Sequence, residues 1–147
     1  MKYCPNGSLK DWLLKRNKRY NQPISEYEIK FIMKQVTLGV QYLHDEFNII
    51  HRDLKLGNII FDQYLNIQIC DFGLATQLKQ DESKKFTVCG TPNFIAPEIA
   101  TAIRNKNGVI EKNNGHSYEV DIWAIGVMIY TLFYNCLLYT SDAADDV

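Results

Sequence analysis

The segment from Ser25 to His44 constrains the fold more than any other part of the chain. Its apolar residues recur at steps of three and four, which is the spacing of an amphipathic α-helix: Ile29, Ile32, Val36, Val40 and Leu43. Ser25 can cap this helix, and Glu28 can complete a capping box. Gly39 lies beside the apolar stripe, where it would let a neighbouring element approach closely. The segment therefore predicts a helix with one buried face.

The pattern changes after Ile50, where two short runs favour β-strands. These runs cover residues 58–61 and 67–70, and the connecting residues 62–66 suit a hairpin. Residues 51–58 are then predicted to form a loop entering the hairpin, and residues 71–73 a turn leaving it. Loops that adjoin rigid strands are common positions for catalytic residues.

Two more helices are predicted, one on each side of this region. Ser8 is a candidate N-cap for a helix of roughly three turns, which Gln22 and Pro23 would end. Residues 118–133 are apolar nearly all round, which predicts a helix buried on every side. Residues 104–115 are rich in Asn, Lys and Gly and are predicted to form an exposed insertion.

Charge and cysteine usage exclude several classes of protein. The 147 residues carry a net charge of -1, with a pI of about 6.3, so nothing points to nucleic acid or a membrane surface. The longest apolar run, residues 122–130, is shorter than the roughly 20 residues that span a bilayer. The four cysteines have no zinc-like spacing, and we interpret them as reduced thiols of a cytosolic or nuclear protein.

Three motifs occur in order along the chain. They are His-Arg-Asp-Leu-Lys-Leu-Gly-Asn at 51–58, Asp-Phe-Gly at 71–73 and Ala-Pro-Glu at 96–98. With this order and spacing, the chain resembles a eukaryotic Ser/Thr protein kinase, and more closely the polo-like kinases. The resemblance implies an α+β, protein kinase-like fold, in which a mainly helical large lobe with short β-hairpins is truncated at both ends. Residues 51–58 would be the catalytic loop and residues 71–98 the activation segment.

The resemblance also implies a role for each polar residue of these motifs. Asp53 would accept the proton of a substrate hydroxyl, and Lys55 would place a cation on the transferring phosphoryl group. Asn58 and Asp71 would hold Mg²⁺ and, with Lys55, contact ATP. Weaker cofactor contacts would come from the backbone between the two lobes, at Met1, Lys2, Tyr3 and Cys4.

Other residues of the motifs would have structural roles: His51, Phe72, Gly73, Thr91, Glu98 and Asp121. Gly73 would let the backbone turn sharply, and Asp121 would hold the backbone of the catalytic loop. The alternative for Asp121 is an ordinary acidic residue at a helix N-terminus. Trp123 and Gly126 are interpreted as packing residues. The likeness to polo-like kinases depends on residues 71–79, 87–98 and 115–123.

Thr87 is a candidate regulatory phosphosite. It lies four residues before Thr91, in a segment that resembles the polo-like activation loop, where the corresponding Thr is phosphorylated. A phosphate there carries a charge of roughly -2, which Arg52 could bind. The alternative is an ordinary exposed Thr.

The resemblance covers residues 1 to about 134 and implies a partial kinase domain at 1–135. The Gly-rich loop and the ATP-binding lysine are not found in these residues, so the isolated chain is expected to be inactive. Residues 136–147 resemble the translation of a transposon-derived sequencing adapter, with a natural acidic tail as the alternative.

The implied parent protein is a Ser/Thr kinase in cell-cycle or centriole control, and the other hypothesis is a non-catalytic, pseudokinase-like binding or regulatory module. The expected partners are protein substrates and an upstream activating kinase, with no nucleic acid and no membrane. The expected location is cytoplasmic, with nuclear, centrosomal or cytoskeletal sites as alternatives.

Overall fold

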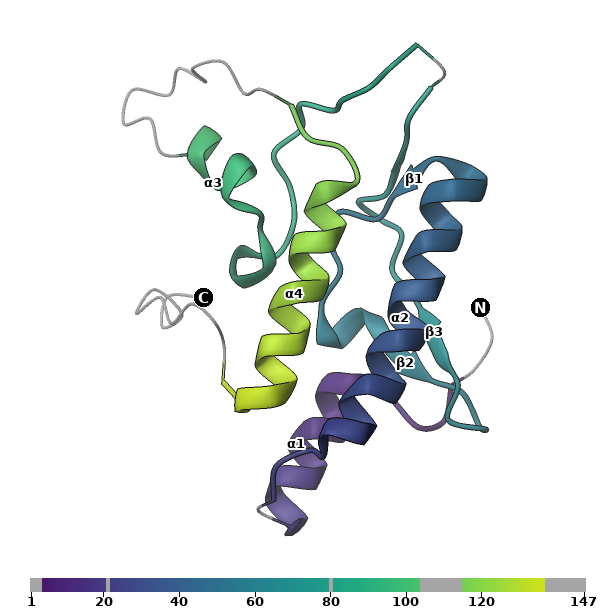
Figure 1. The fold of residues 1–147 in the computed structure, drawn as a ribbon, viewed down its shortest axis with the longest axis vertical. Coiled ribbons are helices and arrows are strands. Elements are labelled where there is room, and N and C mark those ends of the chain that lie inside the picture. Colours follow the sequence, from purple (N-terminus) through teal and green to yellow (C-terminus); the bar gives the residue numbers. More distant parts are fainter. Residues whose placement is uncertain (1–3, 21, 80, 104–114, 137–147) are drawn as a thin grey trace.

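The structure is a computed structural model that describes residues 4–20, 22–79, 81–103 and 115–136 (Figure 1). Helices, 3₁₀ turns and short strands follow one another in the order α1 (Leu9–Tyr20), α2 (Glu26–Phe47), β1 (Ile49–Ile50), η1 (Leu56–Asn58), β2 (Ile59–Phe61), β3 (Ile67–Ile69), β4 (Thr76–Gln77), η2 (Pro92–Phe94), α3 (Pro97–Ile103) and α4 (Glu119–Tyr134). The α+β class is confirmed. None of the helices in these residues is long and apolar enough to cross a membrane.

Helix α2 begins and ends with clear caps. The Ser25 hydroxyl accepts a hydrogen bond from the Glu28 amide at 3.3 Å, and the Glu28 carboxylate accepts one from the Ser25 amide at 2.9 Å. This is the predicted capping box. The helix continues to Phe47 and ends at Asn48, which adopts a left-handed conformation with φ 52°. It is therefore three residues longer than the apolar stripe indicates.

The predicted hairpin is formed by β2 and β3. The two strands are antiparallel, and Ile59 pairs with Ile69. The hairpin packs on α2 at Gly39, where an added Cβ would lie 3.0 Å from the Cδ1 atom of Ile69. The close approach expected at Gly39 is confirmed, and it brings the strand that precedes Asp71 against the longest helix.

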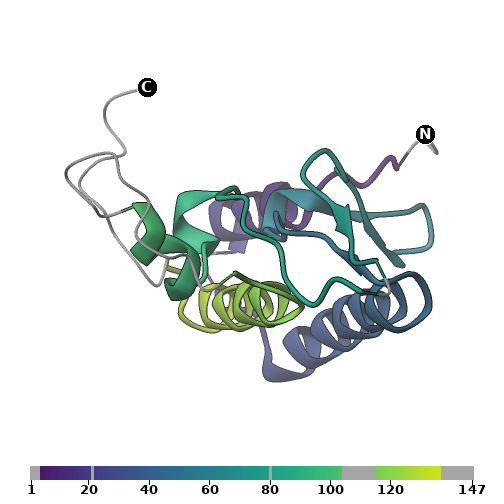
Figure 2. The ribbon, with the colours of Figure 1, turned by 90° about the horizontal axis from the view of Figure 1, so that it is seen from above.

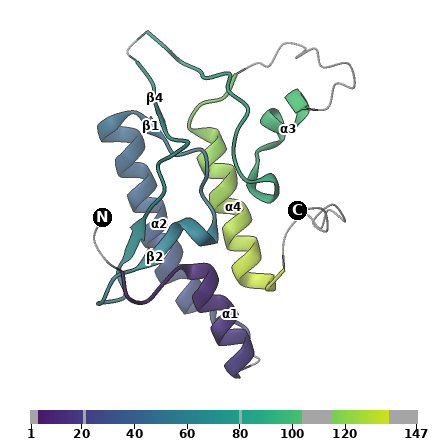
Figure 3. The same ribbon diagram turned by 180° about the vertical axis from the view of Figure 1, so that it is seen from behind.

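The main core lies between α1, α2, the hairpin and α4. Helices α2 and α4 run side by side in opposite directions (Figure 1), and the view from above shows the hairpin on another side of α2 (Figure 2). Seen from behind, α1 crosses below the hairpin (Figure 3). The shared core includes Leu9 of α1, Val36 of α2, Ile59 of β2 and Met128 of α4, all fully buried.

A second, smaller core lies at the N-terminal end of α4. It contains Ile50 of β1, Leu78, Ile99 of α3 and Val120 of α4, next to the small antiparallel sheet of β1 and β4. Residues 51–58, the predicted catalytic loop, contain η1 and connect β1 to β2. The loop therefore runs between the two cores, which fix both of its ends.

Helix α4 is not buried on every side, so this prediction was wrong. Ile122 is 56% exposed and Phe133 is 52% exposed, and both lie on a face that no described residue covers. A Cβ added at Gly126 would meet no atom within 4 Å, so the packing role proposed for Gly126 is also wrong. Apolar composition shows that a helix can be buried, but it does not show whether a neighbouring segment covers it.

The exposed insertion was predicted at residues 104–115. Residues 104–114 lie outside the described ranges, and Gly115 itself is buried. Gly115 has a φ of +72°, and an added Cβ would lie 2.9 Å from the Cβ atom of Lys84. The prediction is wrong at Gly115, because the activation segment packs directly on this residue.

Candidate active site

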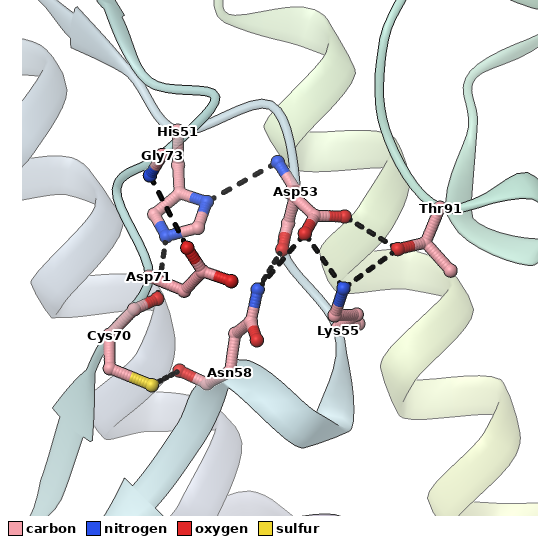
Figure 4. Close-up of polar contacts among 8 residues, drawn as sticks. All are labelled: His51, Asp53, Lys55, Asn58, Cys70, Asp71, Gly73 and Thr91. Atoms are coloured by element: carbon pink, nitrogen blue, oxygen red, sulfur yellow. Dashed lines mark hydrogen bonds and ion pairs between the residues drawn. The ribbon is translucent and has the colours of Figure 1, made fainter.

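Asp53 is the centre of a network of charged and polar side chains. Its side chain is 8% exposed. The carboxylate accepts hydrogen bonds from Lys55 Nζ at 2.7 Å, Thr91 Oγ1 at 2.6 Å and Asn58 Nδ2 at 3.2 Å (Figure 4). Burial alone would raise the pKa of Asp53, but the hydrogen bonds from Lys55 and Thr91 outweigh burial and lower it below its ordinary value of 3.8. The Asp53 carboxylate is therefore ionised at neutral pH.

Thr91 connects the activation segment to this network. Its hydroxyl donates to Asp53, and Lys55 Nζ donates to the same hydroxyl oxygen at 2.9 Å. Thr91 directly precedes η2 and lies 36 residues beyond Lys55 in the sequence. The contact therefore exists only when the activation segment lies against the catalytic loop.

Asp121 of α4 binds the backbone of the catalytic loop. Its Oδ2 atom accepts from the amide of His51 at 2.8 Å, and its Oδ1 atom accepts from the amide of Arg52 at 2.9 Å. Arg52 has a φ of 65°, which is uncommon for a residue with a side chain. The carboxylate also contacts His44 Nε2 at 2.8 Å and is 1% exposed. These contacts fix the residue before Asp53.

The His51 ring joins the catalytic loop to the end of the hairpin. Its Nε2 lies 3.1 Å from the carbonyl oxygen of Cys70, and its Nδ1 accepts from the amide of Asp53 at 3.3 Å. A carbonyl can only accept and an amide N–H can only donate, so the ring carries its proton on Nε2. Cys70 in turn donates its amide to the carbonyl of Asn58 at 2.9 Å. Cys70, which directly precedes Asp71, is thus hydrogen-bonded to both His51 and Asn58.

The turn predicted at Gly73 is confirmed, because Gly73 and Leu74 lie in a turn that the Ala75 amide closes on the Phe72 carbonyl at 3.0 Å. Asp71 has a φ of 63°, whereas Gly73 does not have a positive φ. Gly73 donates its amide to Asp71 Oδ1 at 3.3 Å, and the ring of Phe72 lies 5.0 Å from that of His51. The left-handed residue is Asp71, two positions before Gly73, and it directly follows the hydrogen-bonded Cys70. Asp71 is exposed, so its carboxylate remains accessible.

The donor atoms of Asn58 and Asp71 fit Mg²⁺ bound together with phosphates. Asn58 uses its Nδ2 atom for the Asp53 carbonyl at 2.8 Å, which leaves its amide oxygen for a cation. Asp71 adds a carboxylate, and both are the hard oxygen donors that Mg²⁺ prefers. No group of three or more His, Cys, Asp or Glu side chains suited to a metal occurs in residues 4–20, 22–79, 81–103 and 115–136. The two side chains therefore suit a Mg²⁺ ion whose other ligands are phosphate oxygens.

The candidate regulatory residues lie at the edge of this site. Arg52 donates its Nε–H to the carbonyl of Leu74 at 2.7 Å, and Thr87 is exposed. Glu98 of α3 lines a cavity of about 790 Å³ together with residues of α4. Of the four residues expected to contact ATP through the backbone, Met1, Lys2 and Tyr3 lie outside the described residues, and Cys4 is half-buried.

Two histidines of this region were missed by sequence reasoning. His44 binds Asp121 from α2, and the signal for it is its position four residues after Val40 on the buried stripe. His116, which precedes α4, is completely buried. No local pattern marks it, since its neighbours come from distant parts of the sequence.

Comparison with known proteins identifies similar chains along this whole region. The family profile described as "Protein kinase domain" matches residues 1–147. The "Cell cycle serine/threonine-protein kinase CDC5/MSD2" of Saccharomyces cerevisiae is 47% identical over 132 residues, which cover 90% of this chain and 17% of the yeast protein.

Two further relatives have similar names. The "Serine/threonine-protein kinase polo" of Drosophila melanogaster is 46% identical over 132 residues, covering 90% of this chain and 20% of that protein. The "Probable serine/threonine-protein kinase PLK" of Dictyostelium discoideum is 52% identical over 109 residues, covering 74% of this chain and 10% of that protein. This chain thus spans a small part of each relative's length.

Proposed function

This chain belongs to the protein kinase domain family, and from this premise we propose that its parent protein transfers the γ-phosphate of ATP to Ser or Thr hydroxyls of proteins. The observation that carries the proposal is the network in which Lys55, Asn58 and Thr91 all donate to the Asp53 side chain. A buried carboxylate with several aimed donors has a fixed position and a fixed charge. Both properties suit a group that orients a hydroxyl for attack.

Asp53 is the proposed proton acceptor. Its lowered pKa keeps it ionised at neutral pH, so an incoming hydroxyl can donate a hydrogen bond to it. As the hydroxyl oxygen bonds to the γ-phosphorus, the bond from that phosphorus to the bridging oxygen breaks, ADP leaves, and the hydroxyl proton passes to the carboxylate. Lys55 lies 2.7 Å from the same carboxylate, and its ammonium group can balance negative charge that develops nearby.

Asn58 and Asp71 are the proposed Mg²⁺ ligands. Bound Mg²⁺ would neutralise the charge of the ATP phosphates. The chain's own contribution is positional: the Cys70 amide holds the Asn58 carbonyl, and the following turn directs Asp71 towards the same region. The hinge residues at positions 1–4 are proposed to contact ATP through their backbone.

The relatives suggest a setting for this reaction. They are named as cell cycle, polo and PLK kinases, and we propose that the parent protein acts in cell-cycle or centriole control. Its proposed partners are protein substrates and an upstream kinase that phosphorylates Thr87, and its proposed location is cytoplasmic, nuclear, centrosomal or cytoskeletal. Residues 1–135 remain the proposed kinase part, and residues 136–147 a non-native tail.

The test is the variant Asp53→Asn in the full-length gene product. It keeps the size of the side chain but removes the acceptor for the hydroxyl proton. We expect turnover of a Ser/Thr protein substrate to fall by about 10³-fold or more, while ATP binding, measured by calorimetry, stays within about twofold.

Asp45→Asn is the matched control, because Asp45 is an exposed carboxylate on α2. It should leave turnover unchanged. Unaltered turnover in Asp53→Asn would refute the role of Asp53. ATP binding without any transfer by the unaltered protein would favour the non-catalytic binding module.

A further inference from the structure

An apolar groove lies where α1, α2 and the hairpin meet, and the proposed reaction does not use it. These three elements lie together in the lower half of Figure 1. The groove has a volume of about 170 Å³ and is lined mainly by Trp12 of α1, Tyr27 and Phe31 of α2, Phe61 of β2 and Leu65 of the hairpin turn. A dry cavity of about 150 Å³ takes up a benzene molecule. The groove therefore has room for one large apolar side chain.

The rim of the groove is exposed, although its floor is fixed. Tyr27 is 79% exposed and Phe31 is 54% exposed, whereas Phe61 is buried. The ring of Phe61 lies against that of Trp12, with their centroids 6.1 Å apart. Large apolar side chains that gather at a concave place on the surface are typical of a site that binds another molecule.

Helix α2 is apolar on two opposite faces. One face is the buried stripe that packs into the main core. On the other, Tyr27, Phe31, Leu38 and Tyr42 follow one another at steps of four, seven and four, and all four are exposed. A surface helix normally carries polar residues on its outward face. Packing within the described residues thus explains only the first of these faces.

Leu65 is an unusual residue for its place in the hairpin turn. It has a φ of 66° and is exposed. Hairpin turns with positive φ favour Gly, Asn and Asp, which accept this conformation easily. A leucine there is unfavourable both in its backbone conformation and in its contact with water. Binding of an apolar group in the groove would offset the second of these costs.

The surroundings of the groove are positively charged. Residues 11–34 contain six lysines and arginines and three acidic residues, which gives a net charge of +3 in a chain whose net charge is -1. Each of the three carboxylates, those of Asp11, Glu26 and Glu28, already accepts a hydrogen bond or an ion pair. An acidic group that approaches this region is therefore attracted to it.

Cations lie on both helices that form the groove. The guanidinium of Arg16 lies over the ring of Trp12 at 5.3 Å and binds Glu28, which also lines the groove, through hydrogen bonds of 3.0 and 3.1 Å. Lys15 is exposed one turn beyond Trp12, and Lys34 is exposed on the outward face of α2. A ligand that combines an apolar side chain with nearby carboxylates fits both the floor and its surroundings.

The charge also argues against a second copy of this chain as the occupant. A symmetric contact between two copies places the same surface of each opposite the other. Two regions of residues 11–34, each with a net charge of +3, would then face each other. Like charges that meet across an interface are unfavourable.

We propose that this groove is a docking site for a short segment of the kinase's protein substrates. One apolar side chain of the segment enters the groove, and neighbouring Asp or Glu residues contact the cations of α1 and α2. The inference rests on the proposed function, because it describes which protein substrates that function would select. A second point of attachment raises the local concentration of the substrate at the active site. It should therefore lower KM and leave kcat unchanged.

The first test selects binders from a library of short random peptides, displayed to the full-length protein. Affinities of the selected peptides are measured by fluorescence polarisation. We expect peptides that combine an apolar residue with Asp or Glu, and we expect Phe31→Ala to bind them about tenfold more weakly. Selection of no peptide with this composition would overturn the proposal, as would equal binding by Phe31→Ala.

Tyr42→Ala is the matched control for Phe31→Ala. It removes an exposed aromatic ring from the same face of α2, outside the groove. It should bind the selected peptides as the unaltered protein does. An equal loss of affinity in both variants would show that the peptides bind elsewhere on the outward face of α2.

The second test concerns the acidic part of the segment. Lys34→Glu should weaken binding of the selected peptides about fivefold, mainly through slower association, and added salt should reduce the difference. Lys18→Glu makes the same change of charge at an exposed position on another side of α1 and should have a smaller effect. The same affinity in Lys34→Glu as in the unaltered protein would contradict recognition of acidic residues.

The third test joins a selected peptide to a Ser-containing substrate and measures steady-state kinetics with the full-length protein. We expect KM to fall about tenfold relative to the substrate without the peptide, while kcat stays within about twofold. Phe31→Ala should lose this gain, and Tyr42→Ala should keep it. An unchanged KM would refute docking of substrates, and a gain that persists in Phe31→Ala would place the docking site elsewhere.

Two other occupants would be revealed by direct measurements. A lower molar mass of Phe31→Ala than of the unaltered protein, measured by light scattering, would show that the groove joins two copies. Cross-links from Lys34 to another segment of the same molecule, found by mass spectrometry, would show that the parent chain covers its own groove. Either result would overturn docking of substrates, whereas equal mass and the absence of such cross-links are expected.

Failure of this inference can be separated from failure of the proposed function. Asp53→Asn should lose transfer yet bind the selected peptides as the unaltered protein does, because Asp53 does not line the groove. Peptide binding by an unaltered protein that transfers no phosphate would refute the proposed function. Normal turnover without any peptide bound at the groove would refute the docking site alone.

Discussion

The catalytic loop and the activation segment are held in different ways. His51, Asp53 and Leu54 of the loop are all at most 8% exposed, and buried Asp121 binds the loop backbone. The activation segment is exposed at Phe72, Phe86 and Thr87 and is attached at separate points. These points include the pairing of β4 with β1, the Lys85 bridge and the Thr91 hydroxyl. The loop is thus built into the core, whereas much of the activation segment lies at the surface.

The largest effect is expected from removing the support of the catalytic loop. Asp121→Ala would leave two buried amides and His44 without their acceptor. Each unmet buried group costs about 1–3 kcal/mol, so we expect the free energy of unfolding to fall by roughly 3–5 kcal/mol. Urea denaturation followed by circular dichroism measures it. A loss below about 1 kcal/mol would show that the loop does not depend on the core.

The next largest effect is expected where the activation segment crosses the catalytic loop. Gly90 has a φ of +119°, and an added Cβ would lie 2.9 Å from the carbonyl oxygen of Arg52. Because that oxygen belongs to the backbone, Gly90→Ala must displace one segment, with strain of about 1–3 kcal/mol.

We expect kcat of the full-length protein to fall about tenfold or more in Gly90→Ala, with helix content by circular dichroism unchanged. Gly126→Ala on α4 is the control, since an added Cβ there meets no atom within 4 Å. If both variants lose activity equally, the crossing at Gly90 has no special role.

A smaller effect is expected at the side-chain contact between the two regions. Thr91→Val removes the hydroxyl that donates to Asp53 and accepts from Lys55. One such hydrogen bond contributes about 1 kcal/mol, so kcat should fall roughly fivefold to tenfold. Steady-state kinetics should find near-normal activity in Thr91→Ser, which keeps the hydroxyl. Equal activity of the Val and Ser variants would exclude this role.

The smallest effect concerns acid stability. The pKa of Asp53 is lowered in the folded protein, so its ionised form stabilises the fold above the ordinary value of 3.8. This contribution is lost as the pH falls through the lowered pKa. Urea midpoints at pH 6 and pH 3 should therefore differ more in the unaltered protein than in Asp53→Asn. An equal change in both would indicate that Asp53 is not the titrating group.

Sequence reasoning was most successful where the signals are local. Ser25 and Glu28 are three residues apart and form the predicted cap, and the hairpin between residues 58 and 70 follows from short strands around a turn. At Gly39 the absence of a side chain was enough to predict a close neighbour. These features depend on residues that are close in the chain or on one helix face.

The errors concern contacts between distant segments. The apolar residues of α4 could not reveal that Ile122 and Phe133 lie on an uncovered face. The left-handed conformation at Asp71 had no sequence signal, because it follows Cys70, which is bonded to His51 and Asn58 of another segment. His116 was missed because its backbone partner Lys85 comes from another segment.

The left-handed backbone at Arg52 and Asp71 has a consequence for mutational tolerance. Both residues have a φ near +65°, a conformation that β-branched side chains rarely adopt and that Gly or Asn accept more easily. A saturation scan of either position should therefore separate two constraints. Gly would keep the left-handed backbone conformation but remove the charged side chain. Val or Ile would destabilise that backbone conformation as well as remove the charge. What the two positions tolerate is decided by the path of the backbone as well as by the chemistry of the side chain.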